Sequence, residues 1–515
     1  MVEEERLRKR ISDFIAGEGG MRRLAVVLLP VIVLIFFLTA SGHFGYTPDD
    51  TYIYLRFAEN LVHGNGIAFN AGSPTYGMTS PLWLFIIALG GRIGADLPLA
   101  AKGIDLLLAS LSIIVFYFLA REVIREPGIA LIATVVFSVN AWLIRWAGTG
   151  METSLGVCLT LGSLLYCFRN EYLVSMVLAG LLALVRPEGC VMGFVVLVDY
   201  FFNSIDKRRA VRRVFWLLAA YGIVVLPWLI YAGWTFGTIV PNTARAKADP
   251  NPAFSDFVMS AWSQIKVVGF TEGVLVVVLI VATVYVFRLL RDPNRKEEKT
   301  FVLRYAIVAG LWVLIIPSIF LISGVLIVSR YLLPVIPMVT IFAFANLFRS
   351  VWNEKLFRWV PTIIIGVAVL AVLQNQAGYW KVVKPGIDQF EESMEGSVIP
   401  IGRWLEKNTN STDTVMAWDI GALGYYSRRP VLDAFGLITP EIIPLIHGGV
   451  SPERIMKEGL YRTICRTSYI VCRSPIPDQW KTNPDLVTVM IRSFDQMGLD
   501  DGKKMYYTVY KVVPQ

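Results

Sequence analysis

Long apolar runs recur along the first three-quarters of the chain, separated by short polar segments. The first run, 24–40, follows a charged N-terminal stretch, 1–23. No small-residue cleavage site there precedes a plainly soluble chain, so we interpret this run as a retained signal anchor. A membrane-spanning helix takes about 20 apolar residues. Further runs that can span, with help from their flanks, lie at approximately 98–120, 128–145, 153–168, 171–185, 188–204, 214–233, 271–287, 303–328, 331–348 and 359–376.

One further apolar segment, 80–94, is only about four helical turns long. Basic loops stay on the cytoplasmic side of a membrane. If 80–94 spans the bilayer, the basic clusters 207–213 and 288–304 fall outside, whereas an interfacial or re-entrant helix puts both inside. The second arrangement predicts a polytopic α-helical protein with about eleven spans, a cytoplasmic N-terminus and an extracytoplasmic C-terminus.

This topology divides the chain into a cytoplasmic segment 1–23, a transmembrane domain 24–376 and an outer domain 377–515. Within the transmembrane domain, the long outer loops are 41–97 and 234–270. Composition agrees with a bilayer protein of the plasma membrane: 55% of the residues are hydrophobic and 17% are charged, with a mean hydropathy of +0.56. The net charge is +8, but the basic residues lie between apolar runs, so this charge does not indicate nucleic-acid binding.

The sequence of the outer domain predicts a small α/β domain. Residues 401–407 look helical behind Pro400, and 414–418, 468–472, 486–491 and 506–513 are rich in β-branched and aromatic residues, which is typical of strands. Cys465 and Cys472 lie in this domain. An exported domain would allow them to pair, and two free thiols are equally compatible with the sequence.

The first outer loop contains two adjacent carboxylates, Asp49 and Asp50. Thr47 and Pro48 can begin a helix there, which would put Asp49, Tyr52 and Arg56 on one face. A well-capped amphipathic helix is one interpretation. The other is chemical, because adjacent carboxylates at a bilayer surface are costly unless they are solvated or functional. Such a carboxylate can deprotonate an acceptor hydroxyl or hold a divalent cation.

Further charged residues lie where predicted spans meet the outer surface. Glu152 precedes one span, and Arg186 and Glu188 flank a turn between two others. Each fits a plain helix cap, but together they suggest a polar cavity at the depth of the Asp pair. Arg330, before Tyr331, either snorkels or anchors a lipid phosphate.

No histidine pair has metal-ligand spacing, and neither a nucleotide-binding nor a serine-hydrolase motif is present. The remaining motifs are short and ordered along the chain. They are Asp49-Asp50-Thr51-Tyr52-Ile53, Gly64-Asn65-Gly66, Gly77-Met78-Thr79-Ser80-Pro81-Leu82-Trp83, Gly150-Met151-Glu152-Thr153, Arg186-Pro187-Glu188-Gly189, Pro241-Asn242-Thr243 with Lys247, Arg330-Tyr331-Leu332-Leu333-Pro334 and Asp419-Ile420-Gly421-Ala422-Leu423-Gly424-Tyr425.

This ordered set resembles the polytopic GT-C glycosyltransferases, in particular the branch of the mycobacterial terminal arabinofuranosyltransferases. The resemblance covers nearly the whole chain, and it implies transfer of a sugar from a polyprenyl-phosphate carrier on the outer side of the membrane. It also implies an essential acidic residue in the first outer loop, which is Asp49 or Asp50 here. The chain departs from the branch pattern at Ala71, Ser73, Tyr76 and Met78, which leaves the sugar and the acceptor open.

The resulting hypothesis is an inverting glycosyltransferase of the cell envelope. Asp50 or Asp49 would be the base, and the acceptor hydroxyl would belong to a glycan, a lipid or a protein. The expected donor-phosphate residues are Arg330, Lys247 and Arg186. The expected cavity lining is Tyr52, Arg56, Glu152, Glu188, Asn242 and Tyr331. No cofactor is certain, and a divalent cation, if present, would bind Asp49 and Asp50. The rival hypotheses are a non-catalytic subunit of a surface-glycan assembly and a transporter of lipid-linked sugars.

Overall fold

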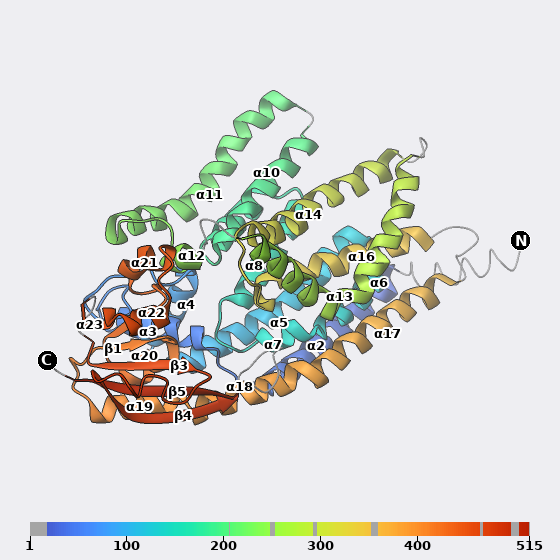
Figure 1. Cartoon of the computed structure of the whole chain (residues 1–515). Helices are drawn as coiled ribbons and strands as arrows, with labels where there is room; N and C mark the ends of the chain where they lie inside the picture. Colours follow the sequence, from blue (N-terminus) through green and yellow to red (C-terminus); the bar gives the residue numbers. More distant parts are fainter. Residues whose placement is uncertain are drawn as a thin grey trace, which may run out of the picture.

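The computed structural model describes residues 18–204, 206–247, 253–291, 296–351, 359–463, 467–495 and 504–513. Helices dominate the part of the chain before residue 380 (Figure 1). They are α2 (Glu18–Ser41), α3 (Asp49–Val62), α4 (Pro81–Arg92), α5 (Leu97–Ile124), α6 (Pro127–Ser138), α7 (Ala141–Trp146), α8 (Thr153–Phe168), α9 (Tyr172–Ala183), η1 (Pro187–Cys190), α10 (Val191–Asn203), α11 (Lys207–Phe236), α12 (Asn242–Lys247), α13 (Phe254–Leu290), α14 (Lys296–Ile322), α15 (Ser329–Leu332), α16 (Ile336–Val351) and α17 (Val360–Gly378).

By length and composition, six helices within the described ranges can cross a membrane. They correspond to α2, α5, α11, α13, α14 and the long helical stretch that begins with α17. The shorter apolar helices are α4, α6, α8, α9 and α16. The total of about eleven spans therefore stays a prediction, as does the interfacial position of α4. Both rest on the distribution of basic loops.

Two predicted segments differ from the structure because helix boundaries depend on local caps. The expected span 128–145 is divided into α6 and α7 at Asn140, whose side chain accepts hydrogen bonds from the Trp142 and Leu143 amides. The expected loop 234–270 is partly helical, because α12 lies within it and α13 already begins at Phe254.

The start of α3 also differs from the prediction. Pro48, not Thr47, occupies the position before the first helical residue, and no side chain caps this end. The Thr47 hydroxyl instead accepts a hydrogen bond from Lys102 Nζ at 2.8 Å and donates one to the Gly45 carbonyl. Thr47 therefore connects the segment before α3 to α5.

The C-terminal region contains a five-stranded mixed sheet with the order β2-β1-β3-β5-β4. Strands β2, β1 and β3 are parallel, and β5 is antiparallel to both β3 and β4. The elements are η3 (Tyr379–Val383), α18 (Lys384–Gly396), α19 (Val398–Asn408), β1 (Val415–Ala417), α20 (Gly421–Ser427), β2 (Val431–Asp433), η4 (Pro440–Ile442), α21 (Ile443–His447), α22 (Pro452–Lys457), α23 (Leu460–Thr463), β3 (Tyr469–Ser474), β4 (Leu486–Asp495) and β5 (Lys504–Val512).

The four predicted strands match β1, β3, β4 and β5, and the structure adds β2, a strand of three residues like β1. Pro400 lies inside α19 rather than before it. The segment that begins at Asp419 continues into helix α20. The possible disulfide involves Cys465, which lies outside the described residues.

Alternate side chains of the central strands enter two apolar cores. On β1, Val415 and Ala417 join the large core that also contains the helical domain, whereas Met416 joins a smaller core with Ile455 and Tyr461. One face of the sheet therefore packs toward α19 and α20, and α20 in turn packs on α3. Figure 1 shows the sheet at the end of the helical domain where α3 and α4 lie.

Candidate active site

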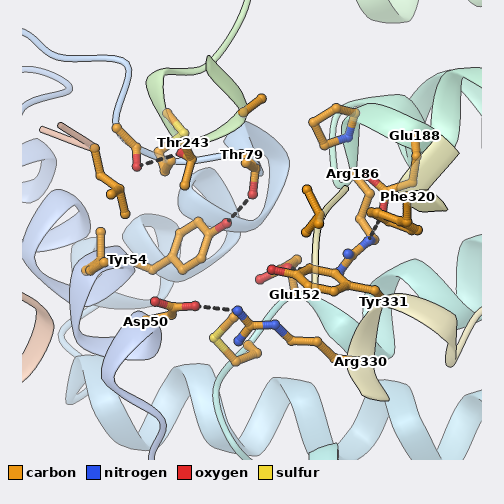
Figure 2. Close-up of a pocket in the computed structure, with 18 of the residues that line it drawn as sticks. Asp50, Tyr54, Thr79, Glu152, Arg186, Glu188, Thr243, Phe320, Arg330 and Tyr331 are labelled. Atoms are coloured by element: carbon orange, nitrogen blue, oxygen red, sulfur yellow. Dashed lines mark hydrogen bonds and ion pairs between the residues drawn. The ribbon is translucent and has the colours of Figure 1, made fainter. Parts of the chain in front are cut away.

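A cavity of about 430 Å³ lies beside α3. Asp50 and Tyr54 come from α3, Arg330 and Tyr331 from α15, and Phe320 from the end of α14. Figure 2 shows Asp50 and Tyr54 on one side of this cavity, facing Arg330 and Tyr331 on the other. Elements far apart in the sequence thus bring one carboxylate and one guanidinium together.

Asp50 forms an ion pair with Arg330 across this cavity. Arg330 is only 8% exposed, and its guanidinium stacks over the rings of Trp146 and Tyr331, each at 5.4 Å. Its Nε is buried and makes no hydrogen bond within the described parts of the chain. A buried donor without a partner is costly. The site therefore offers an unused N–H to an anionic ligand.

A second cluster of charged side chains lies beside the ion pair of Asp50 and Arg330. Arg186 donates from Nε to Glu188 Oε1 at 2.6 Å and from Nη1 to Glu152 Oε1 at 3.2 Å. Glu152 is 4% exposed, and its other carboxylate oxygen has no hydrogen-bond partner among the described residues. The ring of Tyr331 lies against both guanidiniums, 5.1 Å from Arg186 and 5.4 Å from Arg330. Carboxylates and guanidiniums thus alternate along this wall (Figure 2).

The turn that carries Glu152 is held by a buried carboxylate that the sequence analysis did not single out. Asp105 of α5 accepts hydrogen bonds from the amides of Thr149 and Gly150 at 2.8 and 3.1 Å, and from the Thr149 hydroxyl. Gly150 has a φ of +80°, which glycine tolerates best. A single Asp inside the apolar run 98–120 could have indicated such a contact from the sequence, because a buried carboxylate needs hydrogen-bond partners.

Asp49 lies on a different side of α3 and has a different role. Its two carboxylate oxygens accept the backbone N–H groups of Gly421 and Ala422 at 2.9 and 2.8 Å. These amides begin α20, where free N–H groups and the helix dipole favour a carboxylate. Asp49 therefore connects the start of α3 to the C-terminal domain, and Asp50 faces the larger cavity.

The close approach of α20 to α3 yields a stability prediction. A Cβ atom at Gly421 would lie 1.9 Å from the Asp49 backbone oxygen, whereas a Cβ at Gly386 would meet nothing within 4 Å. We expect Gly421→Ala to destabilise the protein by about 1–3 kcal/mol, because the backbone contact must open. Gly386→Ala, in α18, is the matched control and should not destabilise the protein, because alanine is favoured over glycine in a helix by up to about 1 kcal/mol. Thermal unfolding in detergent measures both, and equal melting temperatures would contradict the contact.

The environment of Asp49 yields a pH prediction. Burial, assisted by the nearby carboxylate of Asp419, raises the pKa of Asp49 to about 7. After unfolding, the pKa returns to about 4. Between these values the native state holds a proton that the unfolded state lacks, so stability falls as the pH rises from about 4 to 7. Wild-type protein should melt at a lower temperature at pH 8 than at pH 5, and Asp49→Asn should flatten this dependence. Identical slopes for the two proteins would refute the assignment.

The other expected site residues are distributed more widely. Tyr52 packs on Tyr425 and Tyr426 of α20. Arg56 pairs with Glu59 at 3.2 Å, and Glu59 also pairs with Arg428, which follows α20, at 3.4 Å. Tyr52 and Arg56 are thus on the side of the C-terminal domain and are not among the lining residues of the cavity. Asn242 is buried next to the cavity-lining Thr243. Lys247 ends α12, and its side chain lies outside the described atoms. Tyr54 and Thr79, hydrogen-bonded at 3.2 Å, line the cavity and were not anticipated.

The Asp pair does not fit the suggested divalent cation. Adjacent helical residues point about 100° apart, and here one carboxylate binds the amides of α20 while the other pairs with Arg330. Within the described ranges, no group of three or more His, Cys, Asp and Glu side chains is arranged to hold a metal ion.

Comparison with known proteins adds a sequence relative. The chain is 27% identical over 305 residues to the terminal beta-(1->2)-arabinofuranosyltransferase of Mycobacterium tuberculosis. The match covers 54% of this chain and 46% of that protein, so the chain spans about half the length of this curated relative. A family model described as a domain of unknown function, DUF8728, matches residues 387–510, which include the C-terminal sheet.

Solved structures share the fold over most of the chain. ArnT from Cupriavidus metallidurans, bound to undecaprenyl phosphate, has a TM-score of 0.59 and 14% identity, and the match covers 95% of this chain and 99% of that one. The oligosaccharyltransferase AglB from Archaeoglobus fulgidus, in complex with an inhibitory peptide and a dolichol-phosphate, has a TM-score of 0.59 and 12% identity, covering 86% and 69%. Both are GT-C enzymes. The protein is therefore a multi-pass membrane protein with the GT-C fold, similar in sequence over about half its length to a mycobacterial arabinofuranosyltransferase.

Proposed function

We propose that the protein is an inverting glycosyltransferase that moves a sugar from a polyprenyl-phosphate donor to an acceptor hydroxyl at the outer face of the membrane. The observation that carries the proposal is the ion pair of Asp50 and Arg330 in the cavity wall. A carboxylate there can take a proton, and the guanidinium beside it can offset the charge of a departing phosphate. The undecaprenyl and dolichol phosphates bound to ArnT and AglB support a lipid-phosphate donor.

In the proposed reaction, the Asp50 carboxylate removes the proton of the acceptor hydroxyl as its oxygen bonds to the anomeric carbon of the donor sugar. The bond from this carbon to the phosphate oxygen breaks, and its electron pair leaves with the lipid phosphate. Attack opposite the leaving group inverts the anomeric centre. Arg330 stabilises the leaving phosphate, and its unpartnered Nε is the donor available for a phosphate oxygen.

The remaining cavity walls suit the rest of such a donor. Ile319, Phe320 and Val325, at and after the end of α14, supply apolar surface for a polyprenyl chain. Arg186 already binds two carboxylates, so its proposed role is to hold Glu152 and Glu188 in place near the sugar. Lys247 remains a candidate for a second phosphate contact. The outer-face location rests on the basic loops, which the positive-inside rule assigns to the cytoplasm.

A donor panel tests this function. Purified protein is incubated with different polyprenyl-phosphate sugars and a mixture of glycan acceptors, and the release of polyprenyl phosphate is measured. We expect one donor to be consumed by the wild type and not by Asp50→Asn. Binding of a donor without consumption would favour the non-catalytic subunit. Movement of intact donor across a vesicle membrane would favour the transporter.

A further inference from the structure

A second cavity, of about 240 Å³, lies between α3, α12 and the C-terminal domain. Asp50 lines this cavity as well as the larger one, together with the apolar residues Ile53 and Leu437. The proposed base therefore stands in the wall between two cavities. A two-substrate transfer needs this geometry, because the base must touch the acceptor while the anomeric carbon of the donor lies within bonding reach.

The two cavities differ in charge. The larger one is lined by the guanidiniums of Arg330 and Arg186 together with the carboxyl groups of Asp50, Glu152 and Glu188. The smaller one is lined by the carboxyl groups of Asp49, Asp50, Asp419 and Asp433, and no basic side chain is among its described lining residues. An anionic ligand can therefore pair with a guanidinium in the first cavity, whereas the described lining of the second provides no cation.

The partners of these carboxyl groups show how much of the charge is compensated. Asp419 pairs with Arg473 at 3.1 Å and accepts a hydrogen bond from the Tyr507 hydroxyl at 2.7 Å. Asp433 accepts backbone N–H groups, among them that of Phe435 at 2.8 Å, and Asp49 likewise binds backbone amides. Asp49 and Asp433 thus have neutral hydrogen-bond partners. Burial raises the pKa of Asp49 to about 7 and the pKa of Asp433 to about 6, so their negative charges develop as the pH rises through these values.

The smaller cavity also presents aromatic surface. Trp418, which follows β1, and Phe435, which follows β2, both line it, and Phe435 is 38% exposed. An aromatic face carries partial negative charge and packs well against the C–H groups of a sugar ring, while carboxyl oxygens accept hydrogen bonds from its hydroxyls. The lining thus combines apolar contact with hydroxyl recognition and offers no cation for a phosphate or carboxylate.

We propose that this smaller cavity is the acceptor subsite and that it selects an uncharged, polyhydroxylated acceptor, such as the end of a neutral glycan. The inference rests on the proposed function and narrows it, because acceptors that carry phosphate or carboxylate groups are disfavoured. Trp418 and Phe435 bind the sugar face, and the acceptor hydroxyl reaches Asp50 from the side opposite to the donor. The C-terminal domain thus acts as the acceptor-recognition module.

Acceptor kinetics test the aromatic contacts. With any donor that the wild type consumes, and an octyl glycoside that serves as acceptor, Trp418→Ala and Phe435→Ala should raise the acceptor KM about tenfold. The donor KM should stay unchanged, which a general folding defect would not produce. Trp380→Ala is the matched control, because Trp380 is 60% exposed on η3 and is not among the lining residues of this cavity. Unchanged acceptor KM values in both variants would overturn the proposal.

A charge test examines the acceptor class. The same octyl glycoside, phosphorylated on a hydroxyl that does not receive the sugar, should be used with about 100-fold lower kcat/KM. Ala246→Arg adds a cation to the cavity wall and should reduce the difference in kcat/KM between the neutral and the phosphorylated acceptor. Equal use of both acceptors by the wild type would overturn the inference.

These outcomes separate the two proposals. If the wild type consumes no lipid-linked sugar with any acceptor, the proposed function fails. If it consumes a donor but treats neutral and phosphorylated acceptors alike, the function stands and the acceptor inference fails.

Discussion

Asp50→Asn should lower the rate of sugar transfer by about 10²–10⁴-fold, the usual contribution of a positioned general base. The substitution preserves the shape of the side chain but removes its ability to take the acceptor proton. Because Asp50 points into the cavity rather than into a packed core, the protein should remain folded in the membrane. Steady-state release of polyprenyl phosphate measures the loss, and full activity of the variant would refute the assignment of Asp50.

Asp49→Asn is the matched control for this experiment, because Asp49 is the neighbouring carboxylate. Its oxygens bind the backbone amides of α20, so its loss should lower stability more than the turnover of the protein that stays folded. The double variant with Asn at both positions should transfer sugar no more slowly than Asp50→Asn alone. A larger loss of turnover with Asp49→Asn than with Asp50→Asn would mean that Asp49, and not Asp50, is the base.

Arg330→Gln should lower kcat by about 10²–10³-fold, because the departing phosphate loses its main compensating charge. Arg330→Lys should recover part of the loss, since an ammonium keeps the charge but not the planar set of N–H donors. Single-turnover measurements with the consumed donor report the chemical step separately from product release. Wild-type kcat in Arg330→Gln would exclude Arg330 from stabilisation of the leaving group.

Arg145→Gln provides the control for Arg330. Both guanidiniums stack near the ring of Trp146, at 5.5 Å for Arg145 and 5.4 Å for Arg330. Only Arg330 of the two is among the described lining residues of the cavity and pairs with Asp50. Loss of activity in both variants would indicate that aromatic packing, rather than phosphate charge, sets the effect.

The local pattern predicted much of the helical architecture. Apolar runs matched α5 and α8 closely because helix length and hydropathy are properties of neighbouring residues. The local pattern failed where a single polar side chain decides a boundary, as at Asn140. It also did not identify β2, which forms by parallel pairing with β1. Charge distribution predicted a polar cavity at the outer ends of the spans, and Glu152, Arg186 and Glu188 lie together in the wall of one cavity.

The sequence by itself predicted a membrane protein with adjacent acidic residues after its first apolar run and a mixed α/β domain at its C-terminus. It could not decide between Asp49 and Asp50, which are adjacent and chemically identical. The tertiary structure distinguishes them because neighbours on a helix point about 100° apart. One reaches the start of α20, and the other reaches Arg330, 280 residues away in the chain. Those partners are set by long-range packing, which no local pattern contains.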